Sequence, residues 1–163
     1  MKDFVDLRDG GRQLGERLVD VVASLTDPVL VPVVPNGVPV VLGVREHLTL
    51  PVLPLMTHRS DDGVVVDVIP ALAGRTAVVI DDGVETGTVA RAAVPALRAS
   101  GVARLVLAVP VCPREARADL ALRYDDVVSV AAPLVRRSLA WHYEDFDTID
   151  EAEALRLLQD LGA

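Results

Sequence analysis

The sequence predicts an α/β fold in which a mainly parallel sheet is flanked by helices. Short apolar runs rich in valine alternate along the chain with stretches of helical spacing, which is typical of βαβ units. Hydrophobic residues make up 51% of the chain but aromatic residues only 3%. This composition favours strands that are buried on both faces. A length of 163 residues suits one core, so we expect residues 1–163 to form a single domain.

The first half of the chain is expected to supply helices, strands and a hairpin. Apolar residues recur at helical spacing between Asp9 and Leu25, and Asp27-Pro28 ends this helix. An Asp-Gly pair at 62–63 lies between two apolar runs, which is typical of a hairpin turn. The further elements expected here are a strand at Val29–Val34, a helix at Val38–His47, a strand at Pro51–Met56, a polar loop at Thr57–Gly63 and an apolar run at Val64–Ile69.

The second half is expected to alternate strands with helices. Pro95 should kink the helix that contains it or confine the regular part to one side. Asp150 and Glu153 have the spacing of a capping box, so a last helix should begin there. The other elements expected are strands at Thr76–Ile80, Leu105–Val109 and Val127–Ala131, and helices at Thr86–Ser100 and Pro113–Leu122.

Charge and composition exclude several classes of function. A net charge of −8 argues against nonspecific binding to nucleic acid, which needs clustered lysine and arginine. The single cysteine, Cys112, excludes an internal disulfide and a cysteine-based metal cluster. The acidic N-terminus is unlike a signal peptide, and prolines interrupt the apolar stretch Val29–Val44, so we expect a cytoplasmic protein without membrane contact. The mean hydropathy of +0.37 favours a surface covered by a second copy, as in a homodimer.

The most informative segment is a buried-looking strand that leads directly into two carboxylates. Asp81 and Asp82 follow the apolar run at 76–80, and a short polar turn then reaches Gly87 and a helix-like stretch. Parallel sheets bind ligands at the carboxyl ends of their strands, where a helix N-terminus attracts anions. Two carboxylates that could hold hydroxyls or a metal therefore lie beside a turn that could hold a phosphate. A sugar phosphate could bind the carboxylates through its hydroxyls and the turn through its phosphate.

The segment Val78–Thr88 resembles the signature of type I phosphoribosyltransferases, in which apolar residues, two acids, two further residues and a Thr-Gly turn follow one another. Phe4–Leu14 and Trp141–Phe146 also resemble short motifs of bacterial phosphoribosyltransferase-domain proteins. The resemblance implies a Rossmann-like type I phosphoribosyltransferase core, with a reduced hood and a short mobile loop at 57–63.

The resemblance also implies roles for individual residues. Asp81 and Asp82 would hold the ribose hydroxyls of phosphoribosyl pyrophosphate and, indirectly, Mg²⁺. The turn after them would wrap the 5′-phosphate. Its implied phosphate-binding residues are Val84, Glu85, Thr86, Gly87 and Thr88.

Glu85 matches the position at which purine-type members carry an Asp that exchanges a proton with the base. By this analogy Glu85 is a general acid/base, with a solvated loop charge as the alternative. The loop Pro35-Asn36-Gly37, together with Arg59, would contact pyrophosphate. Asn36 occupies the place where relatives often have Arg.

The expected function is transfer of a phosphoribosyl group to a nitrogenous base, with a purine as one candidate, Mg²⁺ as cofactor and pyrophosphate as product. The reduced set of cations favours the alternative, a noncatalytic regulator that kept the sugar-phosphate pocket. A receiver or phosphatase is disfavoured, because Lys2 is the only lysine. Trp141 and Tyr143 are expected to pack against the core, with a base-stacking wall as the alternative.

Overall fold

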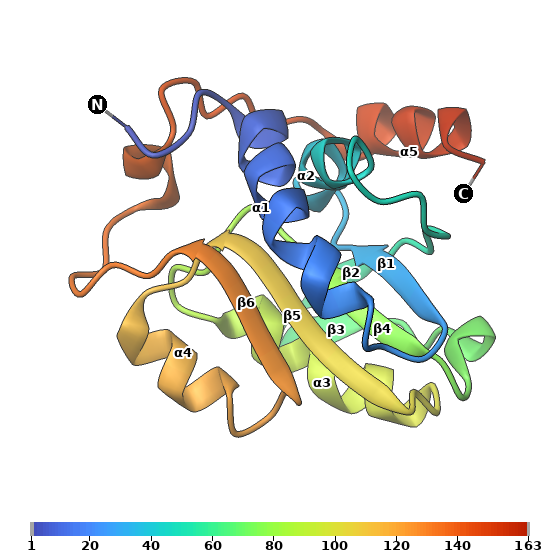
Figure 1. Cartoon of the computed structure of the whole chain (residues 1–163). Coiled ribbons are helices and arrows are strands. Elements are labelled where there is room, and N and C mark those ends of the chain that lie inside the picture. The colour runs from blue at the N-terminus through green and yellow to red at the C-terminus, as the bar shows by residue number, and fades with distance from the viewer. Residues whose placement is uncertain (1, 163) are drawn as a thin grey trace.

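A computed structural model describes residues 2–162, and its centre is a four-stranded sheet with the order β1-β4-β5-β6. All three strand pairs are parallel, in agreement with the predicted fold class (Figure 1). The strands are β1 (Pro28–Pro32), β4 (Thr76–Ile80), β5 (Arg104–Val111) and β6 (Asp126–Ala131).

Helices cover both faces of this sheet, as the valine-rich strands predicted (Figure 1). On one face, alternate strand residues such as Leu30 and Val78 pack with α1, α2 and α5. On the other face their neighbours, such as Val31 and Val79, pack with α3 and α4. The helices are α1 (Leu7–Val22), α2 (Gly37–Val44), α3 (Thr88–Ala99), α4 (Arg114–Leu120) and α5 (Glu151–Asp160), with 3₁₀ turns η1 (Pro70–Leu72) and η2 (Leu139–His142).

Glycines let α1 and α2 approach closely. A Cβ atom on Gly11 would lie 1.9 Å from the Val40 carbonyl oxygen, and one on Gly43 would lie 2.1 Å from the Arg8 carbonyl oxygen. Any larger residue at either position would push the helices apart. Since α2 follows directly from the loop at 35–37, this packing also fixes one wall of the cavity described below.

The prediction of a strand at Pro51–Met56 is wrong. This segment runs beside β1 but makes only isolated bridges, Leu30 with Val52 and Val33 with Leu55. Pro51 and Pro54 lack the N–H groups that a continuous ladder needs.

The hairpin exists, but its first arm is the segment predicted to be a polar loop. Thr57–Ser60 forms β2 and pairs antiparallel with β3, Gly63–Val66. The two arms form a separate two-stranded sheet that carries Arg59 toward the carboxyl end of β1.

Element boundaries otherwise shift by a few residues. Helix α3 begins at Thr88 rather than Thr86, because Gly87 adopts a left-handed conformation with φ of +81°. The helix runs through Pro95, so its regular part is not confined to one side of that residue. The predicted cap of the last helix is confirmed: the Asp150 carboxylate accepts a hydrogen bond from the Glu153 amide at 2.8 Å. Between residues 2 and 162, no helix is both long enough and apolar enough to cross a bilayer.

Candidate functional site

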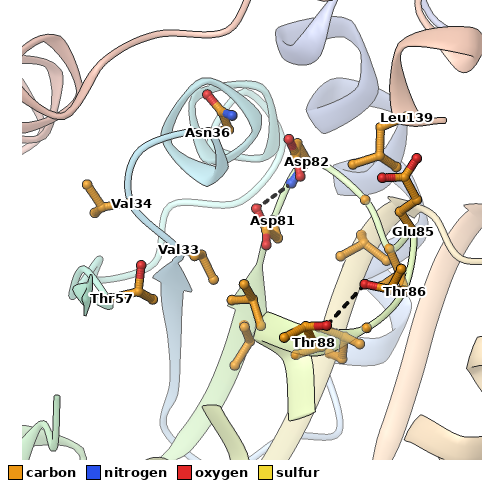
Figure 2. Close-up of a pocket in the computed structure, with 18 of the residues that line it drawn as sticks. Val33, Val34, Asn36, Thr57, Asp81, Asp82, Glu85, Thr86, Thr88 and Leu139 are labelled. Atoms are coloured by element: carbon orange, nitrogen blue, oxygen red, sulfur yellow. Dashed lines mark hydrogen bonds between the residues drawn. The ribbon is translucent and has the colours of Figure 1, made fainter. Parts of the chain in front are cut away.

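A cavity of about 510 Å³ opens at the carboxyl ends of β1 and β4 (Figure 2). The loop after β1, the turn after β4 and Arg59 of the hairpin line it, together with Leu139 of η2. This is the position at which parallel α/β sheets bind ligands. Asp81, Asp82 and Glu85 all belong to the lining.

Asp81 and Asp82 form a tightly packed acidic pair. Asp82 is only 9% exposed and Asp81 is half-buried, and the Asp82 amide donates a 2.8 Å hydrogen bond to Asp81 Oδ1. Burial raises the pKa of Asp81 well above its usual value, and repulsion from Asp82 adds to this effect. Burial also raises the pKa of Asp82. Ionising the pair is therefore costly, and hydroxyl donors or a cation would stabilise the ionised form.

The turn after the acidic pair presents a run of open amides. The Val84 amide is already used, because it donates to the Val111 carbonyl at 2.8 Å. Within the described part of the chain, the amides of residues 85–89 have no hydrogen-bond acceptor. The hydroxyls of Thr86 and Thr88 lie 3.1 Å apart on the same turn, at the N-terminus of α3. Successive free amides at a helix start are well suited to binding a phosphate.

The Glu85 side chain is exposed and extends from this turn toward Leu139 (Figure 2). In the same view the Glu85 side chain points away from Thr88. The negative charge of Glu85 is among the factors that raise the pKa of Asp82. Glu85 thus lies between the acidic pair and the cavity rim.

The loop at 35–37, predicted to hold pyrophosphate, has few free donors. Pro35 has no N–H group and follows a cis peptide bond, and the Gly37 amide donates to the Val33 carbonyl at 2.8 Å. The Asn36 side-chain oxygen accepts a 3.2 Å hydrogen bond from the amide of Ile149. Pro35 and Asn36 line the cavity, whereas Gly37 packs behind them against the end of β4.

The C-terminal segment supports the acidic turn, a role that sequence reasoning missed. Tyr143 is buried, and its hydroxyl donates a 2.7 Å hydrogen bond to the Asp82 carbonyl. Its ring packs between Phe4 and Phe146, at centroid distances of 5.2 and 5.4 Å. Gly83 has a φ of +145°, which favours glycine, and a Cβ atom there would lie 2.6 Å from the end of the Leu139 side chain. The motif at 141–146 drew attention to this segment in the sequence, but it did not indicate the contact between Tyr143 and Asp82.

Neither Trp141 nor Tyr143 lines the cavity, so the structure does not form the alternative base-stacking wall. Tyr143 packs in the core as expected. The same expectation is wrong for Trp141, which is 45% exposed beside the cations of Lys2 and Arg137.

Comparisons with known proteins bear on the fold. No family model matches the chain. Two Mycobacterium tuberculosis strains have a protein provisionally named a phosphoribosyl transferase that is 29% identical over 210 aligned residues. The match covers 97% of this chain, which spans about half (47%) of the relative's length. A crystal structure of a Thermus thermophilus protein superposes with a TM-score of 0.84, at 23% identity and 99% coverage of both chains.

A hypoxanthine phosphoribosyltransferase from Staphylococcus aureus has the same fold. Its TM-score is 0.58 at 16% identity, with 79% of this chain and 74% of that chain covered. The chain has the fold of the type I phosphoribosyltransferases. The fold expected from the motif at 78–88 is thereby confirmed. At these identities the solved structures show the fold alone.

Proposed function

We propose that this phosphoribosyltransferase-like protein binds a 5-phosphoribosyl group in the cavity. The ribose diol would lie on Asp81 and Asp82, and the 5′-phosphate on the amides of residues 85–89 with the hydroxyls of Thr86 and Thr88. The observation that carries this proposal is that a buried acidic pair and a run of open amides line one cavity. The two features match the two ends of a ribose 5-phosphate.

We further propose that the group is transferred from phosphoribosyl pyrophosphate to a nitrogenous base, with a purine as the first candidate. The bond from C1 to the pyrophosphate oxygen breaks as a bond from C1 to the base nitrogen forms. The cation-like sugar that develops would be stabilised by the nearby carboxylates. Glu85, which is exposed and lines the cavity, would take the proton that the base releases.

Mg²⁺ is the proposed cofactor, and the acidic pair fits it. Burial raises the pKa of both carboxylates, so a neighbouring cation would favour their ionised form. No group of three or more metal-ligating side chains exists among residues 2–162, which suits an ion held largely by substrate oxygens and water. The ion would neutralise charge on the departing pyrophosphate.

A noncatalytic sensor of sugar phosphates is the second candidate. The loop at 35–37 favours it, since Asn36 carries no charge, Pro35 has no N–H group and the Gly37 amide already donates to the Val33 carbonyl. Such a protein would bind a phosphoribosyl ligand without releasing pyrophosphate.

We also propose that the chain acts as a single domain and as a homodimer. Several large apolar side chains are exposed, among them Leu122 (86%), Leu134 (76%) and Val135 (63%). Light scattering should then give twice the chain mass of 17.4 kDa, whereas the mass of one chain would contradict the dimer.

An assay of pyrophosphate release separates the two candidate functions. With phosphoribosyl pyrophosphate, Mg²⁺ and a panel of purine and pyrimidine bases, a transferase should release pyrophosphate with at least one base. Glu85→Gln should then lower kcat by about 10²–10³-fold with little change in KM for phosphoribosyl pyrophosphate, because it removes proton transfer and not binding. Binding of the ligand without release, for every base, would favour the sensor.

A further inference from the structure

The two ends of the cavity differ in their capacity to hold a phosphate. At the turn after β4, the amides of residues 85–89 are open and two threonine hydroxyls stand beside them. Helix α3, which starts there, has 12 residues, so its N-terminal dipole adds to the attraction. This end can surround one phosphate with donors.

The other end, at the loop after β1, has fewer open donors than the turn after β4. Pro35 has none, and the N–H groups of Gly37 and Val38 donate to the carbonyls of Val33 and Pro35 at 2.8 and 3.1 Å. The Asn36 side-chain oxygen accepts from the Ile149 amide, and its NH2 group faces the Asp82 carboxylate, so among the donors of residues 35–38 the Asn36 backbone amide alone stays open. A Cβ atom on Gly37 would lie 2.5 Å from the Ile80 carbonyl oxygen, so the loop is packed against the end of β4.

The charged side chains that line the cavity also disfavour a pyrophosphate at the loop after β1. The described lining of the cavity includes the carboxylates of Asp81, Asp82 and Glu85 but only one cationic side chain, that of Arg59. Arg59 belongs to the exposed hairpin arm β2. A pyrophosphate placed at the loop end would add further negative charge without a matching set of donors.

We infer that the cavity is built for a ligand with a single phosphate, and that ribose 5-phosphate or a nucleoside 5′-monophosphate binds at least as tightly as phosphoribosyl pyrophosphate. This inference rests on the proposed function, since it assumes that the cavity holds a phosphoribosyl group. In the transfer reaction, it means that the site favours the nucleotide over the pyrophosphate-bearing substrate.

Calorimetric titration of the wild-type protein tests the inference. Ribose 5-phosphate, adenosine and guanosine 5′-monophosphates, phosphoribosyl pyrophosphate and pyrophosphate alone are titrated with and without Mg²⁺. We expect the Kd for phosphoribosyl pyrophosphate to be no more than about threefold below that for ribose 5-phosphate, and pyrophosphate alone not to bind. The titrations with the two nucleoside monophosphates show whether the base adds affinity.

The outcomes separate this inference from the proposed function. If phosphoribosyl pyrophosphate binds more than about threefold tighter than ribose 5-phosphate, the inference is overturned while the proposed function stands. If none of the phosphoribosyl ligands binds, the proposed function itself fails.

A gain-of-binding variant gives a second test. Asn36→Arg adds a cation to the loop end and should raise the affinity for phosphoribosyl pyrophosphate by about tenfold or more, with ribose 5-phosphate unchanged. As a control, Thr88→Val removes a hydroxyl from the other end and should weaken both ligands equally. No gain in Asn36→Arg, or an equal gain for both ligands, would count against the inference. Should Asn36→Arg not fold, the wild-type comparison decides.

Discussion

At the scale of single residues, the acidic pair Asp81 and Asp82 is the centre of the candidate site, and its ionisation lowers the stability of the fold. Asp81 and Asp82 could be predicted as site residues from the sequence because an apolar strand precedes them and a Thr-Gly turn follows. Their partners could not be predicted in the same way. Tyr143 reaches the Asp82 carbonyl across 61 positions of sequence, and Asn36 reaches Ile149 across 113. Such contacts depend on how the elements pack, which local spacing does not encode.

Removing the charge at position 81 should stabilise the protein while it abolishes ribose binding. The folded-state pKa of Asp81 is raised, so its ionised form costs stability at neutral pH, and this cost disappears as the pH falls toward the unfolded value of 3.8. We expect Asp81→Asn to gain about 1–2 kcal/mol at pH 7. The gain corresponds to a rise in Tm of about 2–4 °C for each kcal/mol.

Thermal unfolding at pH 7 and pH 4 measures this difference. The control is Asp20→Asn, since Asp20 is exposed on α1 and should show no gain. A fall in the Tm of Asp81→Asn at pH 7 would contradict the assignment of a strained carboxylate.

The lone cysteine should be inert in the folded protein. Burial raises the pKa of the Cys112 thiol to about 11, so almost no thiolate exists at pH 8. Iodoacetamide should leave the native protein unmodified and alkylate it fully in denaturant, as mass spectrometry would detect. Because the folded pKa is the higher one, the stability from this group is complete below pH 9 and is lost as the pH rises through 11. Complete labelling of the native protein would refute this account.

At the scale of elements, the sheet strands were predictable and the segment beside β1 was not. Strand β4 has the predicted bounds, because a continuous apolar run between polar residues leaves little choice. Residues 51–56 have a similar composition, but prolines limit them to isolated bridges. The polar segment at 57–60 becomes a strand because β3 pairs with it, which composition alone does not indicate.

The C-terminal segment should stabilise the acidic turn through one hydrogen bond. Tyr143→Phe removes the donor to the buried Asp82 carbonyl, which should cost about 1–2 kcal/mol of unfolding free energy. Loosening of the turn should also weaken ribose 5-phosphate binding several-fold. Denaturant unfolding and calorimetric titration measure the two effects.

A matched control separates stability from binding. Tyr124→Phe removes a hydrogen bond of the same length, 2.7 Å, from a buried tyrosine to the Ala90 carbonyl of α3. It should cost similar stability with little change in ligand affinity. Equal loss of affinity in both variants would mean that Tyr143 acts only through global stability.

At the scale of the whole molecule, the fold brings distant segments to one edge of the sheet. The loop after β1, the turn after β4 and the C-terminal segment meet there, because β1 and β4 are adjacent and parallel. Sequence predicted the layers and the parallel sheet. It did not predict the strand order, and therefore not that the Gly37 and Val38 amides would be used internally.

The central claim is that the open amides after the acidic pair hold the phosphate of a phosphoribosyl ligand. The most direct measurement is an amide-resolved NMR titration of ¹⁵N-labelled protein with ribose 5-phosphate and Mg²⁺. We predict that the amides of residues 85–89 shift most, while those of Gly37 and Val84, which are bonded within the protein, stay in place. Unchanged amides at 85–89 under saturating ligand, or shifts centred elsewhere on the molecule, would contradict the account.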